Sequence, residues 1–177
     1  PKHPHIQSVR AYPGIEALPE VPDLAVIATP PETVPGLVAQ LGGAGTKAAV
    51  VITAGFGEGG QPRGRELQQA VLDAARPHLL RIVGPNCLGI MVPGIGLNAG
   101  FGGTAPLHGR LAFVTQSGAV VASVVDWATE RGIGFSHVAS LGDMADVDFG
   151  DMLDYLADDR ESRAILLYIE AVTDVRK

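Results

Sequence analysis

The sequence predicts an α/β protein built on parallel sheets, and three observations support this fold class. Short runs rich in valine and isoleucine alternate with longer segments in which apolar residues recur every three or four positions. Hydrophobic residues make up 46% of the chain, which suits strands that are buried on both faces. The 23 glycines and 13 prolines fall between the apolar runs rather than in tracts. These features indicate strands that are joined by crossover helices.

The first half of the chain follows this alternation after a polar, proline-rich opening. In its second helix Leu67, Val71 and Ala74 recur at helical spacing, and a glycine-rich loop at 55–64 precedes that helix. Three strands are few for a doubly wound sheet, so we expect this lobe to be partial. The expected elements are a strand at 24–28, a helix at 32–42, a strand at 47–53, a helix at 65–76 and a strand at 81–83.

Residues 91–109 break the alternation, because they hold six glycines and two prolines with no usable period. We interpret this segment as the connection between two lobes, which divides the chain into domains at 1–100 and 101–177. The next βαβαβ unit is only half of a doubly wound sheet, so the second lobe is also expected to be partial. Its expected elements are a strand at 110–115, a helix at 117–131, a strand at 135–140, a helix at 148–157 and a strand at 164–170.

Composition and charge argue against several classes of partner. Lys and Arg number 13 against 19 Asp and Glu, and no basic stretch is interleaved with aromatic residues, so nucleic acid is a poor candidate. The apolar runs are far shorter than the roughly 20 residues of a membrane-spanning helix. The single cysteine excludes an internal disulfide and favours a cytoplasmic location. We expect no metal site, and we interpret one acidic run as a solvated loop that leads into a helix: Asp143, Asp146, Asp148 and Asp151.

Loops that follow four predicted strands share small or rigid residues, which let a ligand approach the backbone closely. Each alone reads as an ordinary turn, but four in succession favour a nucleotide-like ligand. Ser117 either only caps the helix that follows it or also leaves free N–H groups there for a phosphate. Cys87 is either a reactive thiol or, as is commoner, a small buried side chain. The four loops lie at 28–30, 53–56, 84–89 and 115–119.

A plain NAD-binding domain is disfavoured, because no G-x-G-x-x-G string opens a predicted helix. A different family is indicated by residues 81–90, which read R-I-V-G-P-N-C-L-G-I, and 113–119, which read F-V-T-Q-S-G-A. In this order, and across essentially the whole chain, such strings resemble the NDP-forming acyl-CoA synthetases, relatives of the succinyl-CoA ligase α subunit. Further matching strings lie at 96–101, 132–136, 140–143 and 168–170.

The resemblance implies a Rossmann-like CoA-binding lobe followed by a flavodoxin-like ligase lobe, and it implies an activity. Family members couple cleavage of an acyl-CoA to NTP synthesis from NDP and phosphate, through an acyl phosphate and a phosphorylated histidine. The turn with Ser117 and Gly118 would present a helix N-terminus to that histidine, and Glu170 would orient it. Residues implied to bind the CoA thioester, with the cysteine nearest the sulfur, are Lys2, Thr29, Pro30, Thr53, Ala54, Asn86 and Cys87.

Departures from the family pattern lead us to expect an incomplete enzyme. The chain holds no match to the catalytic histidine, nor to the first strand and the small-residue loop that receives the CoA phosphates. The ATP-grasp domain, which would bind ADP or ATP with magnesium, is expected as a further domain or a partner subunit. A homo-oligomer is compatible with the sequence. The alternative is an acyl-CoA-sensing regulatory module of a protein lysine acetyltransferase, which would not need the histidine.

Overall fold

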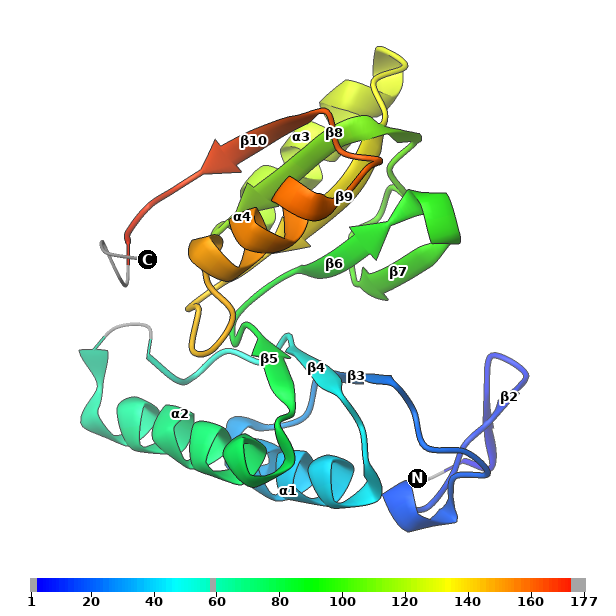
Figure 1. Cartoon of the computed structure of the whole chain (residues 1–177). Helices are drawn as coiled ribbons and strands as arrows, with labels where there is room; N and C mark the ends of the chain where they lie inside the picture. The colour runs from blue at the N-terminus through cyan, green and yellow to red at the C-terminus, as the bar shows by residue number, and fades with distance from the viewer. Residues whose placement is uncertain (1–2, 58–59, 173–177) are drawn as a thin grey trace.

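Two lobes, each with its own sheet, make up the chain (Figure 1). The computed structural model describes residues 3–57 and 60–172. The first lobe is built on a three-stranded parallel sheet in the order β3-β4-β5. Its elements in chain order are β1 (His5–Ile6), β2 (Val9–Arg10), η1 (Ile15–Ala17), β3 (Leu24–Ile27), η2 (Pro31–Thr33), α1 (Val34–Ala44), β4 (Ala48–Val51), α2 (Pro62–Ala75), η4 (Arg76–His78) and β5 (Arg81–Val83).

The two faces of the first sheet bury apolar side chains against different layers. Helices α1 and α2 lie side by side on one face (Figure 1), where Val38, Val71 and Ile82 belong to one buried cluster. On the opposite face Val50 packs with Cys87 and with Ala99 of the second sheet. The strands are therefore covered on both sides, which explains why they read as continuous apolar runs.

The second lobe has a five-stranded sheet in the order β10-β8-β9-β6-β7. Phe113 packs with α3, whereas its neighbours Ala112 and Val114 pack with α4, so the two helices cover opposite faces of the sheet. The elements of this lobe are β6 (Gly89–Val92), η5 (Pro93–Ile95), β7 (Leu97–Gly100), β8 (His108–Thr115), α3 (Gly118–Glu130), β9 (Phe135–Ser140), α4 (Phe149–Asp158) and β10 (Ala164–Tyr168).

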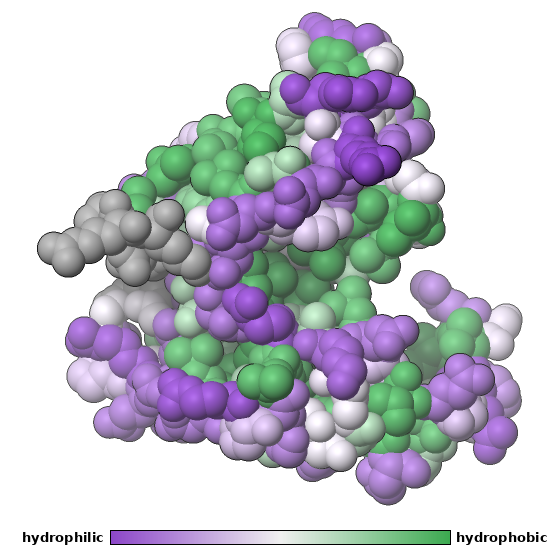
Figure 2. All heavy atoms as spheres, in the orientation of Figure 1, coloured by the Kyte–Doolittle hydropathy of each residue, from purple (hydrophilic) through white to green (hydrophobic). Residues whose placement is uncertain are grey.

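Strand β10 forms one edge of the second sheet and leaves apolar side chains exposed. Ile165, Leu166 and Tyr168 are all in this group. Figure 2 shows hydrophobic surface over this part of the lobe, while hydrophilic side chains cover much of the rest of both lobes in that view.

The predicted α/β alternation is confirmed, and every predicted strand and helix agrees with the structure within three residues at each end. The largest difference is at α2, which begins at Pro62 rather than at residue 65. Proline suits the first turn of a helix, where its missing N–H would have no partner. Within the described ranges, no helix combines the length and the apolar character needed to cross a bilayer.

The prediction that residues 91–109 only connect the lobes is wrong. This interval contains most of the β6–β7 hairpin, and β6 pairs with β9 of the second sheet as well as with β7. Both pairings are antiparallel, so the sheet is mixed rather than wholly parallel. The hairpin strands have only four residues, and Gly89 is required at its position because a Cβ would collide with the carbonyl oxygen of Ala99. Such short, glycine-rich strands give no readable period.

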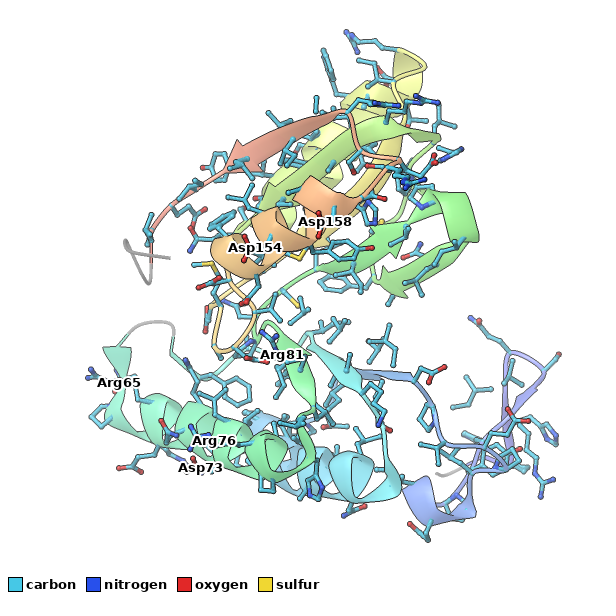
Figure 3. All side chains as sticks on the ribbon, in the orientation of Figure 1. Arg65, Asp73, Arg76, Arg81, Asp154 and Asp158 are labelled. Carbon is cyan, nitrogen blue, oxygen red and sulfur yellow. The ribbon has the colours of Figure 1, made fainter. Side chains whose placement is uncertain are left out.

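The two lobes meet along the junction loop, which we define as residues 141–147. Arg81 lies at one end of this loop (Figure 3). Its guanidinium contacts the carboxylates of Asp146 at 3.0 Å and of Asp151, in α4, at 3.3 Å. The hydrogen bond that Arg81 donates to the Asp146 carboxylate is the main cause that raises the pKa of Arg81 above its ordinary value. Three backbone hydrogen bonds continue the contact: Asp143 N–H to Pro85 O at 2.9 Å, Ala145 N–H to Gly84 O at 3.0 Å and Val147 N–H to Ile82 O at 3.1 Å.

Candidate functional site

Helix α3 begins at the carboxyl end of β8 and presents backbone N–H donors at its first turn. The Ser117 hydroxyl caps the helix by accepting from the Val120 N–H at 3.4 Å. The Ser117 N–H in turn donates to the Thr115 hydroxyl at 3.0 Å. Within residues 3–57 and 60–172, the N–H groups of Gly118 and Ala119 have no acceptor. These groups lie at the positive end of the helix dipole, which favours an anion.

Gln116 ties the end of β8 to the end of the neighbouring strand β10. Its backbone N–H donates to the Tyr168 carbonyl oxygen at 3.3 Å. Its side-chain Oε1 accepts from the backbone N–H groups of Glu170 and Ala171, each at 2.7 Å. The backbone of Glu170 is therefore fixed beside the start of α3, although its side chain is exposed.

A polar hollow of about 310 Å³ opens where these strand ends meet the junction loop. Four of the residues that line it were predicted as site residues: Asn86, Ser117, Gly118 and Glu170. The other lining residues are Gln116, Gly142 and Asp143. None of the seven carries a positive charge, so neutral N–H donors would have to stabilise an anion there.

The predicted CoA residues of the first lobe lie at the carboxyl ends of β3, β4 and β5. The Thr53 hydroxyl donates to the Thr29 carbonyl oxygen at 2.7 Å, and this bond joins the first two of these ends. Thr29, Pro30 and Ala54 are exposed. The Asn86 N–H donates to the Thr53 carbonyl oxygen at 3.0 Å, which adds the third end. Lys2 lies outside the described residues.

The two groups of strand ends are joined by a contact between Asn86 and Asp143. The Asn86 side-chain Nδ2 donates to Asp143 Oδ1 at 3.2 Å. Asn86 has φ of 56° and Gly142 also has φ of 56°, in the left-handed region. Glycine is required at 142 because a Cβ there would collide with the carbonyl oxygens of Pro85 and Asn86. One continuous edge thus runs from the first lobe to the start of α3.

Cys87 follows Asn86, but its thiol faces the protein interior. The side chain is 3% exposed, and its Sγ donates to the Val51 carbonyl oxygen at 3.3 Å. Burial raises the pKa of the thiol from 9.0 to about 12. These features favour the interpretation of Cys87 as a small buried side chain over that of a reactive thiol.

One residue of the site and one sequence motif were missed in the sequence. Asp143 was grouped with the solvated acidic run, although its place directly after the strand at 135–140 is the signal that could have identified it. Residues 55–60 do have the spacing G-x-G-x-x-G between β4 and α2, so the statement that no such string opens a helix was wrong. In the described part of the chain, no group of three or more His, Cys, Asp or Glu side chains is placed to hold a metal ion.

Comparison with known proteins assigns both lobes. Residues 1–93 match the family model of a CoA binding domain, and residues 108–177 match that of a succinyl-CoA ligase like flavodoxin domain. The chain belongs to the NDP-forming acyl-CoA synthetase family. It is 42% identical to the acetate–CoA ligase [ADP-forming] I of Archaeoglobus fulgidus over 177 residues. It is 43% identical over 172 residues to the α subunit of acetate–CoA ligase [ADP-forming] II of Pyrococcus furiosus.

Solved structures of similar proteins have the same fold. The chain superposes on PH0766 of Pyrococcus horikoshii OT3 with a TM-score of 0.92 at 43% identity, over 97% of this chain and 39% of that one. It superposes with a TM-score of 0.91 at 34% identity on the acetyl-coenzyme A synthetase 1 of Candidatus Korarchaeum cryptofilum in complex with phosphate and ADP, over 98% of this chain and 37% of that one. The match to the Archaeoglobus ligase covers all of this chain but only 26% of that protein. The match to the Pyrococcus furiosus α subunit covers 97% of this chain and 37% of that subunit.

Proposed function

We propose that this synthetase-family chain binds a CoA thioester along the strand ends of its first lobe and holds the phosphoryl group at the start of α3. It does so as part of an enzyme that interconverts acyl-CoA, NDP and phosphate with acid, CoA and NTP. The polar hollow is the observation that carries this proposal, because strand ends of both lobes contribute residues to its lining. The named relatives are ligases, which favours this function over the acetyltransferase-linked sensor.

The first step that the site can support is attack of phosphate on the thioester carbonyl. The new P–O–C bond gives an acyl phosphate, and the C–S bond breaks to release CoA as the thiolate. The exposed edge at Thr29, Pro30 and Ala54 lets the cofactor approach the backbone closely. The free N–H groups of Gly118 and Ala119 would stabilise the charged phosphate oxygens.

Glu170 has its proposed role in the second step, in which a histidine ring nitrogen attacks the phosphorus of the acyl phosphate. The N–P bond forms, the P–O bond to the acyl group breaks, and the acid leaves as its carboxylate. That histidine would come from a part of the enzyme beyond the matched region, as would an ATP-grasp domain or subunit that binds ADP or ATP with magnesium. A carboxylate that accepts from the imidazole N–H orients the ring and stabilises its positive charge. We place the enzyme in the cytoplasm, with a homo-oligomer compatible with the fold.

The Glu170→Gln variant of the complete ligase tests this function. Removing one charged hydrogen bond should slow formation of the phosphohistidine by about ten- to hundredfold. The dissociation constant of CoA should stay unchanged, because the first-lobe edge is intact. Rapid-quench labelling with acetyl-CoA and radioactive phosphate measures the rate. Glu66 is an exposed glutamate of α2, and Glu66→Gln is the matched control. Labelling of Glu170→Gln at the rate of the unaltered enzyme would contradict the assigned role.

A further inference from the structure

The hydrogen bonds of Gln116 determine which way its side-chain amide points. An amide has one acceptor atom, the oxygen, and one nitrogen with two N–H donors. Both partners at 2.7 Å are backbone N–H groups, those of Glu170 and Ala171. Two donors must face an acceptor, so the atom between them is Oε1 and not Nε2. The network therefore assigns the orientation of the amide.

This orientation leaves the Gln116 Nε2 with two N–H donors and no acceptor in the part of the chain that the structure describes. Gln116 lines the hollow together with Ser117 and Gly118. The free N–H groups of Gly118 and Ala119 lie at the adjacent helix start. The side-chain amide and the helix start thus offer donors to the same space.

We propose that Gln116 is a phosphoryl-binding residue, whose Nε2 donates to a phosphoryl oxygen while its Oε1 positions the backbone of Glu170. The inference rests on the proposed function, since it names a further contact for the same phosphoryl group. A neutral donor suits this hollow, because Asp143 and Glu170 already place carboxylates on its lining.

Two substitutions separate the two roles of Gln116. Gln116→Glu keeps an oxygen that accepts from the Glu170 and Ala171 N–H groups but removes the Nε2 donors. Gln116→Leu removes both the oxygen and the donors. Inorganic phosphate is the probe, and its affinity for the 177-residue chain is measured by calorimetry. Hydrogen exchange at the amides of Glu170 and Ala171 reports the positioning role separately.

Gln116→Glu should bind phosphate about ten- to hundredfold more weakly while the two amides keep their protection from exchange. Gln116→Leu should also bind weakly, and its two amides should exchange at least about tenfold faster. Gln40→Glu adds the same charge on the exposed surface of α1 and should leave both measurements unchanged. Circular dichroism of each variant confirms folding.

Unaltered phosphate affinity in Gln116→Glu would overturn the donor role while leaving the proposed function in place. A native chain that binds no phosphate at high millimolar concentration would overturn the phosphate part of the proposed function, and the donor role with it. Unaltered exchange at Glu170 and Ala171 in Gln116→Leu would overturn the positioning role alone.

Discussion

The junction loop contacts the first lobe at two places that differ in chemistry. At the first place Arg81 forms ion pairs with Asp146 and Asp151. The Asp146 carboxylate also accepts from the Ile82 N–H at 2.8 Å. At the other, the neutral Asn86 amide meets Asp143 beside an open hollow. The first contact pairs charged groups of the protein with each other, whereas the second borders N–H donors that have no acceptor among residues 3–57 and 60–172. Stability and ligand binding are thus assigned to opposite ends of one loop.

Replacing Gly142 should have the largest effect, because it changes the backbone on which the open contact depends. An alanine Cβ would collide with two carbonyl oxygens while the residue holds a left-handed φ. The Gly142→Ala variant should lose about 3 kcal/mol of unfolding free energy or more, as measured by urea denaturation. Gly103 has open space around it, so Gly103→Ala is the control and should unfold like the unaltered chain. Equal stability of the two variants would show that the junction loop can adopt another backbone conformation without loss, which would contradict the prediction.

Cys87, which is buried beside Val50 and Ala99, should make the stability of the chain sensitive to alkali. Its pKa of about 12 in the folded chain exceeds the ordinary 9.0, so the unfolded thiol ionises first as the pH rises. The contribution of the neutral Cys87 thiol to the unfolding free energy is therefore fully present below pH 9. It is lost between pH 9 and 12, by about 1.4 kcal/mol per pH unit. Denaturation of the unaltered chain and of Cys87→Ala at pH 8 and pH 10 measures this slope. The unaltered chain should fall more steeply, and parallel behaviour would mean that the thiol reaches solvent.

Removing the charged contact should have a smaller effect, because Arg81 is about half exposed. The Arg81→Gln variant should lose about 1 kcal/mol of unfolding free energy at low salt and less in 1 M NaCl, where screening is strong. Arg160 is exposed and makes no ion pair among the described residues, so Arg160→Gln should change little. A loss for Arg81→Gln that is insensitive to salt would show that packing, not charge, accounts for this contact.

The sequence was informative where local rules decide the structure. Buried strands read as apolar runs, and Asn86, Ser117 and Glu170 could be singled out because they follow such runs in a motif order typical of the family. A buried Cys87 was favoured only by the usual preference of the residue type, and the packing with Val50 and the second sheet that buries the thiol could not be predicted. The β6–β7 hairpin was missed because its strands have only four residues and β6 is stabilised by pairing with β9, far away in the sequence. Tertiary contacts, not local preference, decide both features.

The central claim is that the strand ends of the two lobes form one site, and a two-ligand NMR titration tests it most directly. The ¹⁵N-labelled chain is titrated with inorganic phosphate and, separately, with acetyl-CoA at millimolar concentration. Phosphate should shift the amides of Gly118 and Ala119, and acetyl-CoA should shift those of Thr53 and Ala54. Both ligands should shift the Asn86 side-chain amide, because it lies where the two edges meet. Two sets of shifts with no resonance in common, or phosphate shifts confined to residues outside the hollow, would contradict the account.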